Sequence, residues 1–209
     1  MECSQGSSAR LERSLPKVTD SIGSYPTDAG EYFRELVSGF AITASLVSDQ
    51  HGSTVSSEGS SSGLGNDTDR SLLVALRRQA KVILTSGKTF RSDRYRFPKH
   101  ADLAVLSNQE LDISVPDGQK LILSHQGYQQ ALTDLRPKGY KRVHVEYGTT
   151  GIRALVEAKA LDALLLSSRH KSGVLALAME LKVEPILLEL EDLYVGLMAW
   201  QPGSNPLAR

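Results

Sequence analysis

The sequence lacks the features that mark disulfide scaffolds, membrane proteins and nucleic-acid binders. Its only cysteine, Cys3, excludes an intrachain disulfide and a cysteine-rich zinc site. No apolar run approaches the roughly 20 residues of a membrane helix, and the N-terminus has no apolar signal segment. Lys+Arg and Asp+Glu balance at 24 each, so no basic excess favours nucleic acid or an anionic membrane. We therefore expect a soluble, cytoplasmic protein whose partner is a small molecule.

The histidines give no sign of a metal site. There are five, scattered along the chain without an H-x-E-x-H pattern or an i,i+4 pair: His51, His100, His125, His144 and His170. No metal is predicted from this spacing, although a site assembled from distant residues stays open.

The remaining composition predicts one domain behind a short tail. Residues 1–30 are rich in Ser, Gly, Pro and charge and are expected to be a flexible tail, with a single domain over 31–209. Short apolar strands are expected at 39–47, 81–85, 102–107, 120–125, 142–148 and 162–168. Helices are expected after Asn66 and over 128–136, 150–160 and 173–181, and two strands over 185–200. This alternation predicts an α/β fold with a mostly parallel central sheet flanked by helices.

A long segment of small residues, 48–67, separates the first predicted strand from the first predicted helix. So much Ser and Gly is typical of a flexible linker. Its position inside the domain favours an active-site loop instead, because such loops follow the carboxyl ends of parallel strands.

The stretch LTSGKTFRSDRY (84–95) resembles the end of a phosphate-binding P-loop but lacks its beginning. G-x-x-x-x-G-K-[ST] requires a glycine five residues before Gly87, where this chain has Val82. The residues after Thr89 also lack the apolar spacing of a following helix. A nucleoside-triphosphate site is therefore excluded, and the sequence predicts a strand-to-loop turn that carries Gly87, Thr89 and Asp93.

Read together with its surroundings, this turn is part of a longer pattern. The pattern comprises Ser45, Asp49 with Gly52, SSSGLGNDTDR (60–70), LLVALR (72–77), VILTSGKT (82–89) and Asp93. It resembles the pyrimidine reductases of riboflavin biosynthesis (the RibD C-terminal domain), which have a dihydrofolate-reductase-like fold. The spacing through 60–95 matches without a gap.

The resemblance continues toward the C-terminus and covers roughly residues 40–200. The family's E-G-G-P turn before a helix corresponds to Glu146-Tyr147-Gly148-Thr149, and its D-E-L strand begins at Asp162. The family's sheet is mostly parallel, with antiparallel C-terminal strands. The deaminase half that many members carry is missing, since there is no H-x-E…P-C-x-x-C signature.

The resemblance implies a cofactor, NADPH, and a set of contacts to it. The residues that match cofactor-binding positions are Gly63, Thr89, Asp93, Gly148, Thr149, Thr150 and Gly151. The last four also form a small-residue turn before a helix, which can bind an anion through free amides. Lys88 and Arg91 are the nearest cations for an NADPH 2′-phosphate, although exposed charge is an equally good explanation.

Three residues match the family's substrate positions: Ser61, Arg77 and Glu146. Ser61 can hydrogen-bond a pyrimidine ring or ribityl group, Glu146 can accept from ring N–H groups, and Arg77 can meet an anionic tail. Glu146 and Asp49 are the candidates for a catalytic role.

The chain departs from the family pattern in ways that leave two functions open. The D-G pair is interrupted as Asp49-Gln50-His51-Gly52, and Tyr147 replaces the first glycine of E-G-G, where it either narrows the cleft or points into the core. The first hypothesis is an NADPH-dependent reductase of a pyrimidine- or pteridine-like substrate. The second is a catalytically degenerate, homodimeric ligand-binding or interaction module. A homodimer is expected in either case.

Overall fold

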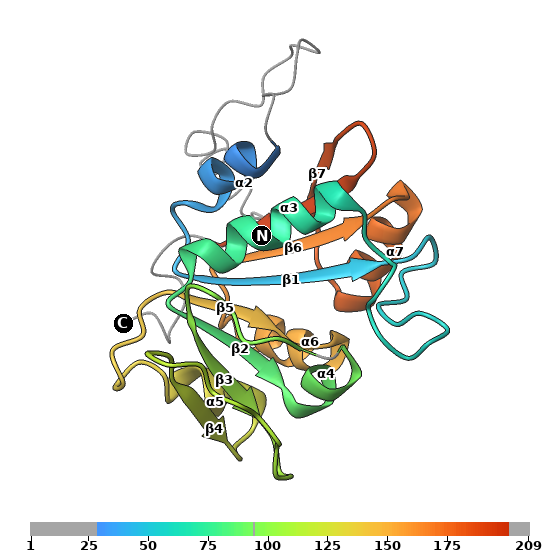
Figure 1. Ribbon diagram of the computed structural model, residues 1–209. Coiled ribbons are helices and arrows are strands. Elements are labelled where there is room, and N and C mark those ends of the chain that lie inside the picture. Colours follow the sequence, from blue (N-terminus) through green and yellow to red (C-terminus); the bar gives the residue numbers. More distant parts are fainter. Residues whose placement is uncertain (1–28, 94, 201–209) are drawn as a thin grey trace, which may run out of the picture.

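The computed structural model of the chain describes residues 29–93 and 95–200 (Figure 1). The strands are β1 (Ile42–Ser48), β2 (Val82–Ser86), β3 (Asp102–Leu106), β4 (Leu121–Ser124), β5 (Val143–Glu146), β6 (Ala163–Ser168), β7 (Ile186–Glu189) and β8 (Tyr194–Ala199). The helices are α2 (Ala29–Val37), α3 (Asp67–Gln79), α4 (Gly87–Ser92), α5 (Tyr128–Thr133), α6 (Thr149–Glu157) and α7 (Lys171–Leu181).

All eight of these strands form one sheet in the order β4-β3-β2-β5-β1-β6-β8-β7. The six strands from β4 to β6 are mutually parallel, whereas β8 runs antiparallel to both β6 and β7. Strand β1 lies between β5 and β6, so it is paired with a parallel strand on both sides. The predicted α/β class, with a mostly parallel sheet and antiparallel C-terminal strands, is confirmed.

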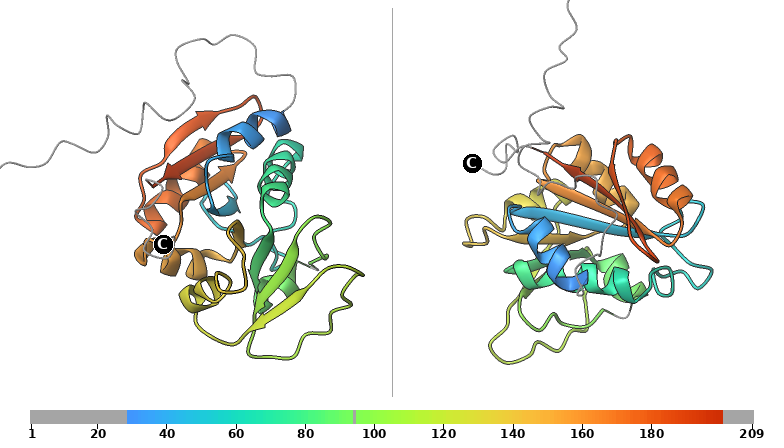
Figure 2. Two further views of the ribbon diagram at one scale, coloured as in Figure 1. Left: turned by 90° about the vertical axis from the view of Figure 1, so that its left-hand side faces the viewer. Right: turned by 90° about the horizontal axis from the view of Figure 1, so that it is seen from above.

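Helices cover both faces of the sheet, which explains why the central strands are apolar on both sides. On one face, α2 and α3 bury Phe33, Leu72 and Leu76 against Leu165. The other face carries α5, α6 and α7, whose apolar residues pack with alternate residues of the same strands, such as Leu164. The two layers of helices are seen on opposite sides of the sheet in Figure 2.

Two helices differ from the sequence prediction. Helix α2 begins at Ala29, inside the predicted tail of residues 1–30, and its Phe33, Leu36 and Val37 have the helical spacing of a buried face. The rest of that tail lies outside the described residues. Helix α4 occupies the predicted turn after β2. Its six residues form a helix because Ser86 caps it and Phe90 packs on the cluster of Ile83 and its neighbours.

The parallel strands place their carboxyl ends along one edge of the sheet. In Figure 1 the arrowheads of β1, β2, β5 and β6 point toward the same side, where the segment 49–66, α4 and the start of α6 are found. Ligands of open parallel sheets bind at this edge. Among the described residues, no helix has the length and apolar character needed to cross a membrane.

Candidate active site

A cleft of about 940 Å³ lies at the carboxyl edge of the parallel strands. Cavities of roughly 300–1,000 Å³ are the usual size for small-molecule sites, and this one is at their upper end. Strand β5 divides the lining into two sides. The β1 side consists of residues from β1, α3, β6 and the segment 49–66, and the β3 side of residues from α4 and the loops after β3 and β4. Glu146 and the turn Tyr147–Gly151 lie between them.

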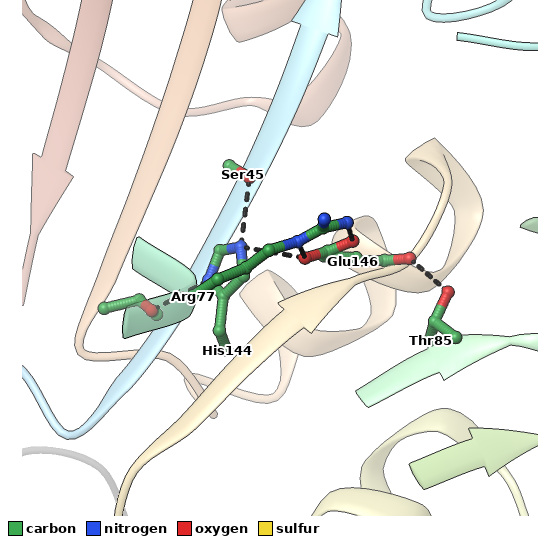
Figure 3. Close-up of polar contacts among 6 residues, drawn as sticks. Ser45, Arg77, Thr85, His144 and Glu146 are labelled. Carbon is green, nitrogen blue, oxygen red and sulfur yellow. Dashed lines mark hydrogen bonds and ion pairs between the residues drawn. The ribbon is translucent and has the colours of Figure 1, made fainter. Parts of the chain in front are cut away.

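Glu146, at the end of β5, is held by an ion pair with two hydrogen bonds. Arg77 of α3 donates from Nε to Oε1 at 2.7 Å and from Nη2 to Oε2 at 2.7 Å (Figure 3). Such two-pronged pairs fix both the charge and the orientation of the carboxylate. Burial alone would raise the pKa of Glu146, but the Arg77 guanidinium outweighs it and lowers the pKa. Glu146 therefore presents an ionised acceptor to the cleft.

His144 lies beneath this pair and is fully buried. Its Nδ1 shares a hydrogen bond with Thr43 Oγ1 at 2.9 Å, and its Nε2 shares one with Ser45 Oγ at 3.3 Å. Nε2 is also 3.7 Å from Glu146 Oε1 (Figure 3). Burial lowers the pKa of His144 to about 4, against the opposing pull of Glu146. The ring is therefore neutral near pH 7 and connects β1 to β5 through hydrogen bonds.

Arg77 is enclosed on its other face by Tyr95. The guanidinium carbon is 5.1 Å from the centroid of the Tyr95 ring, a cation–π distance. Burial beside the Glu146 carboxylate raises the pKa of Tyr95. Arg77 itself does not line the cleft. The structure thus places Arg77 behind Glu146, where it orients the carboxylate, and gives no support to its predicted contact with an anionic tail.

On the β3 side, the predicted cofactor residue Thr89 lies in the first turn of α4. Its amide donates to Ser86 Oγ at 3.1 Å, and the two hydroxyls are 2.9 Å apart. Gly87 is required beside it, because an added Cβ would lie 2.6 Å from Ser107 Oγ. Lys88 and Arg91 line the same side with exposed side chains.

Ser61 and Asp93, predicted for substrate and cofactor respectively, contact each other. Ser61 Oγ donates to Asp93 Oδ2 at 2.8 Å, and the Ser61 amide donates to Oδ1 at 3.3 Å. Both residues line the cleft. This link joins the segment 49–66 to the end of α4. The segment is therefore part of the cleft wall, as expected of an active-site loop.

The turn from β5 into α6 supplies donors that the protein does not use. Gly148 is the N-cap of α6 without a side-chain hydrogen bond, and the amides of Thr149 and Thr150 have no acceptor among the described residues. The Thr149 hydroxyl bonds to Thr54 Oγ1 at 2.9 Å. Free amides at the start of a helix favour an anion, and both residues line the cleft.

Tyr147 packs into the core rather than filling the cleft. It is 2% exposed, and its ring centroid is 5.0 Å from that of Tyr128 in an edge-to-face arrangement. Gly151 makes room for it, because an added Cβ there would lie 2.8 Å from Tyr147 Cβ. The Tyr147 hydroxyl has no hydrogen-bond partner among the described residues, and burial raises its pKa. Its edge contributes to the cleft lining beside Gly148.

Besides Arg77, two further predicted site residues do not line the cleft. Asp49, predicted to be catalytic, accepts through Oδ1 from the amides of His51 at 2.8 Å and Ser53 at 2.9 Å. Its carboxylate stabilises the turn that the interrupted D-G pair creates. Gly63, predicted to contact the cofactor, has a positive φ of 81° and lies on an exposed part of the segment 49–66.

Four residues near the cleft were not predicted from the sequence: Asp69, Tyr95, His144 and Ser167. Each acquires its role from a neighbour distant in the chain, which no short motif records. Among the described residues, no three His, Cys, Asp or Glu side chains gather closely enough to hold a metal ion.

Comparison with known proteins gives structural relatives only. No protein-family model and no curated protein sequence matches the chain. A pyrimidine reductase-like protein from Corynebacterium diphtheriae superposes with a TM-score of 0.57 at 17% identity, over 85% of this chain and 96% of that one. A deaminase/5-amino-6-(5-phosphoribosylamino)uracil reductase from Thermotoga maritima gives 0.55 at 13% identity, over 80% of this chain and 59% of that one.

RibD of Acinetobacter baumannii is a third such structure, with a TM-score of 0.53 at 13% identity over 79% of this chain and 60% of that one. At these identities the likeness concerns the fold. The resemblance first seen in residues 45–95 is thereby confirmed in three dimensions: the chain has the fold of the RibD-type pyrimidine reductases of riboflavin biosynthesis.

Proposed function

We propose that the protein is an NADPH-dependent reductase in the class of the riboflavin-pathway pyrimidine reductases, acting on a pyrimidine- or pteridine-like substrate. The observation that carries the proposal is the cleft itself. It combines free amides of Thr149 and Thr150 at a helix start with a carboxylate, Glu146, that is held ionised. The first suits a pyrophosphate and the second suits the N–H edge of a heterocyclic ring.

The β3 side, together with the adjoining Gly148–Gly151 turn, fits a dinucleotide. The Gly148–Gly151 turn offers amides to the pyrophosphate, Thr89 and Asp93 offer hydroxyl and carboxylate partners, and Lys88 and Arg91 are the cations that line the cleft. When bound, the nicotinamide would supply the hydride, while these residues bind and orient the cofactor.

The β1 side fits a flat heterocycle. Ser45, Ser61 and Glu146 supply polar contacts, and Val47, Leu72 and Leu73 supply an apolar surround. A pocket that is mostly apolar, with a few oriented polar groups, is the usual environment for such a ring. Because Arg77 fixes Glu146, the acceptor is in place before a ligand arrives.

Titration of the purified protein with NADPH by calorimetry tests the proposal. We expect saturable binding that is lost in the double variant Thr89→Ala/Asp93→Ala. The matched control is Thr133→Ala/Asp134→Ala, which removes the same two residue types from α5, outside the cleft. Absence of binding at millimolar NADPH by the folded wild-type protein would contradict the reductase proposal.

The second candidate is a non-catalytic, homodimeric module with the same fold. The turn formed by Asp49 favours it, because the carboxylate predicted to be catalytic is used in a local hydrogen-bonded turn. Reduction of 5-amino-6-(5-phosphoribosylamino)uracil or of dihydrofolate with NADPH would exclude this candidate. A ligand-binding dimer that oxidises no NADPH with either compound would support it.

A further inference from the structure

Asp69 is a carboxylate of the cleft to which neither the sequence pattern nor the proposed function assigns a role. It is the third residue of α3 and lines the β1 side together with Ser167 of β6. Ser167 Oγ donates to Asp69 Oδ1 at 2.5 Å. Ser167 is 2% exposed, so the partner that holds the carboxyl belongs to the core of the sheet.

The start of α3 is built to hold this carboxyl in position. Asn66 caps the helix by accepting from the Asp69 amide at 2.9 Å. Gly65 passes directly over the carboxyl group, because an added Cβ would lie 2.1 Å from Asp69 Oδ2. Only a residue without a side chain permits this approach. The orientation of Asp69 is therefore fixed by its cap, by the loop and by Ser167.

Asp69 differs from the other two carboxylates that line the cleft. Glu146 is paired with Arg77, and Asp93 accepts from Ser61 and Ser92. Asp69 has one neutral partner and no cation among the described residues. Burial raises its pKa, and the hydrogen bond from Ser167 only partly opposes this. Two carboxyls whose pKa values are pushed apart in one cleft divide naturally into a proton donor and an ionised acceptor.

Among the described residues, no charged group pairs with the Asp69 carboxyl. The ionisable residues of α3, of the helix α2 packed on it and of the adjoining strands and loops include Glu31, Arg34, Glu35, Asp67, Arg70, Arg77, Arg78, His144, Glu146, His170 and Asp192. None of them forms a hydrogen bond or ion pair with the Asp69 carboxyl in the part of the chain that is described.

We propose that Asp69 donates the proton that accompanies hydride addition, to a substrate ring lying between Ser167 and Glu146. This inference rests on the proposed reductase function. Strands β5 and β6 are separated by β1 alone, so their backbones are about 10 Å apart, which leaves room for one heterocycle. Val47 of β1 and Leu72 and Leu73 of α3 provide the apolar surround of that space.

The chemical step balances with one proton from Asp69. With a bound nicotinamide as the hydride donor, a C–H bond would form at the electrophilic carbon of a C=O or C=N group, and the π-electron pair would move to the heteroatom. The O–H bond of the Asp69 carboxyl breaks as the heteroatom–H bond forms. The Asp69 carboxylate that remains accepts a hydrogen bond from Ser167 and regains its proton from water.

The first test needs no substrate. The ¹³C resonance of the Asp69 carboxyl, assigned by its loss in Asp69→Asn, is followed by NMR as a function of pH. We expect a midpoint above the ordinary aspartate value of 3.8. In Ser167→Ala the midpoint should rise further, because a hydrogen bond to the ionised form is lost. A midpoint at or below 3.8 would overturn the proposal.

The second test uses 5-amino-6-(5-phosphoribosylamino)uracil and NADPH as probes. We expect Asp69→Asn to lower the rate of NADPH oxidation by about 100-fold, the usual loss when a general acid is removed. The control Asp67→Asn should retain the wild-type rate, and both variants should bind NADPH as the wild type does. In Ser167→Ala the decline of the rate at high pH should move to higher pH, which a purely structural residue would not cause.

The two tests separate this inference from the proposed function. Absence of NADPH binding by the wild-type protein contradicts the reductase proposal. The NMR titration of the carboxyl then still decides whether Asp69 holds its proton more tightly than an ordinary aspartate. Normal turnover by Asp69→Asn contradicts the role of Asp69 while leaving the reductase proposal intact.

Discussion

The two sides of the cleft are built in different ways. The β3 side and the Gly148–Gly151 turn next to it consist largely of backbone turns and small residues, such as that turn itself and the start of α4. The β1 side depends on side chains from distant segments that pair across the sheet, such as Arg77 with Glu146 and Asp69 with Ser167. A backbone turn is determined by a few consecutive residues, whereas a pair of side chains from distant segments comes together only in the folded protein. The first kind of site can therefore be recognised in a sequence far more easily than the second.

The largest effect should come from breaking the pair on the β1 side. Arg77→Met leaves the Glu146 carboxylate buried without its partner, and we expect a loss of about 3 kcal/mol in the free energy of unfolding, measured in urea. Arg78→Met, at an exposed position of the same helix, is the control and should have little effect. Equal losses in the two variants would refute a structural role for the pair. In Arg77→Met/Glu146→Gln part of the loss should be recovered.

The next effect is a pH dependence of the free energy of unfolding, caused by His144 on the β1 side. Its pKa is lowered by burial from the usual 6.5 to about 4, so the unfolded chain takes up a proton first as the pH falls. Stability is complete above pH 6.5 and is lost progressively toward pH 4, by about 3 kcal/mol in full.

Urea unfolding at pH 7.5 and at pH 5 measures how steeply the free energy of unfolding falls with pH. Glu146 does not complicate the result, because its lowered pKa lies below this pH range. The slope should be shallower in His144→Gln and unchanged in His100→Gln, since His100 is exposed. An identical slope in wild type and His144→Gln would show that another group titrates.

A pair of glycine variants tests the backbone-built side. Gly151→Ala should destabilise the protein by about 1–3 kcal/mol, because the new Cβ meets Tyr147 and Tyr128 within the packed core. At Gly148 an added Cβ meets nothing within 4 Å, so Gly148→Ala should leave stability unchanged. The same variant should weaken NADPH binding, because the added methyl group would lie in the turn proposed to hold the pyrophosphate. Thermal unfolding and calorimetry measure the two properties separately. Unaltered NADPH affinity in Gly148→Ala would place the cofactor elsewhere.

The smallest effect is expected at the exposed cations of the β3 side. Lys88→Gln and Arg91→Gln should each reduce the preference for NADPH over NADH by up to about fivefold, since an exposed ion pair contributes at most about 1 kcal/mol. Lys99→Gln, an exposed lysine outside the cleft lining, serves as the control. The measurement is the ratio of the two dissociation constants at low ionic strength. Increasing the salt concentration should reduce the preference in the wild type.

The fold was largely predictable from the sequence, because each central strand is a short apolar run bounded by polar residues. KVILT, for example, predicts β2 to within one residue of its start and end. Helix α2 also had a recognisable signal in the spacing of Phe33, Leu36 and Val37, but it adjoins a segment of tail-like composition. Helix α4 had no such signal in the sequence, because its stability depends on Phe90 packing against strands that the sequence alone does not position.

The site was predictable only where it follows a motif. Thr89, Asp93 and the Gly148–Gly151 turn, which the resemblance assigns to the cofactor, all line the cleft, and their contact with NADPH stays a prediction. Asp69 and Ser167 are 98 residues apart, and neither stands out within its own segment. Asp49 illustrates the converse, because two inserted residues turned a motif position into the centre of a local turn.

The hydrogen bonds from Ser61 to Asp93 have a thermodynamic consequence for ligand binding. They join a wall of the β1 side to a residue proposed to contact the cofactor, and the Thr54–Thr149 bond makes a second such connection. A ligand on one side of the cleft that strengthens or weakens the Ser61–Asp93 or the Thr54–Thr149 hydrogen bond also changes the free energy of ligand binding on the other side. For the two ligands of the proposed function, linkage requires that the change in substrate affinity caused by the dinucleotide equals the change in dinucleotide affinity caused by the substrate. Measuring one of these ratios therefore determines the other.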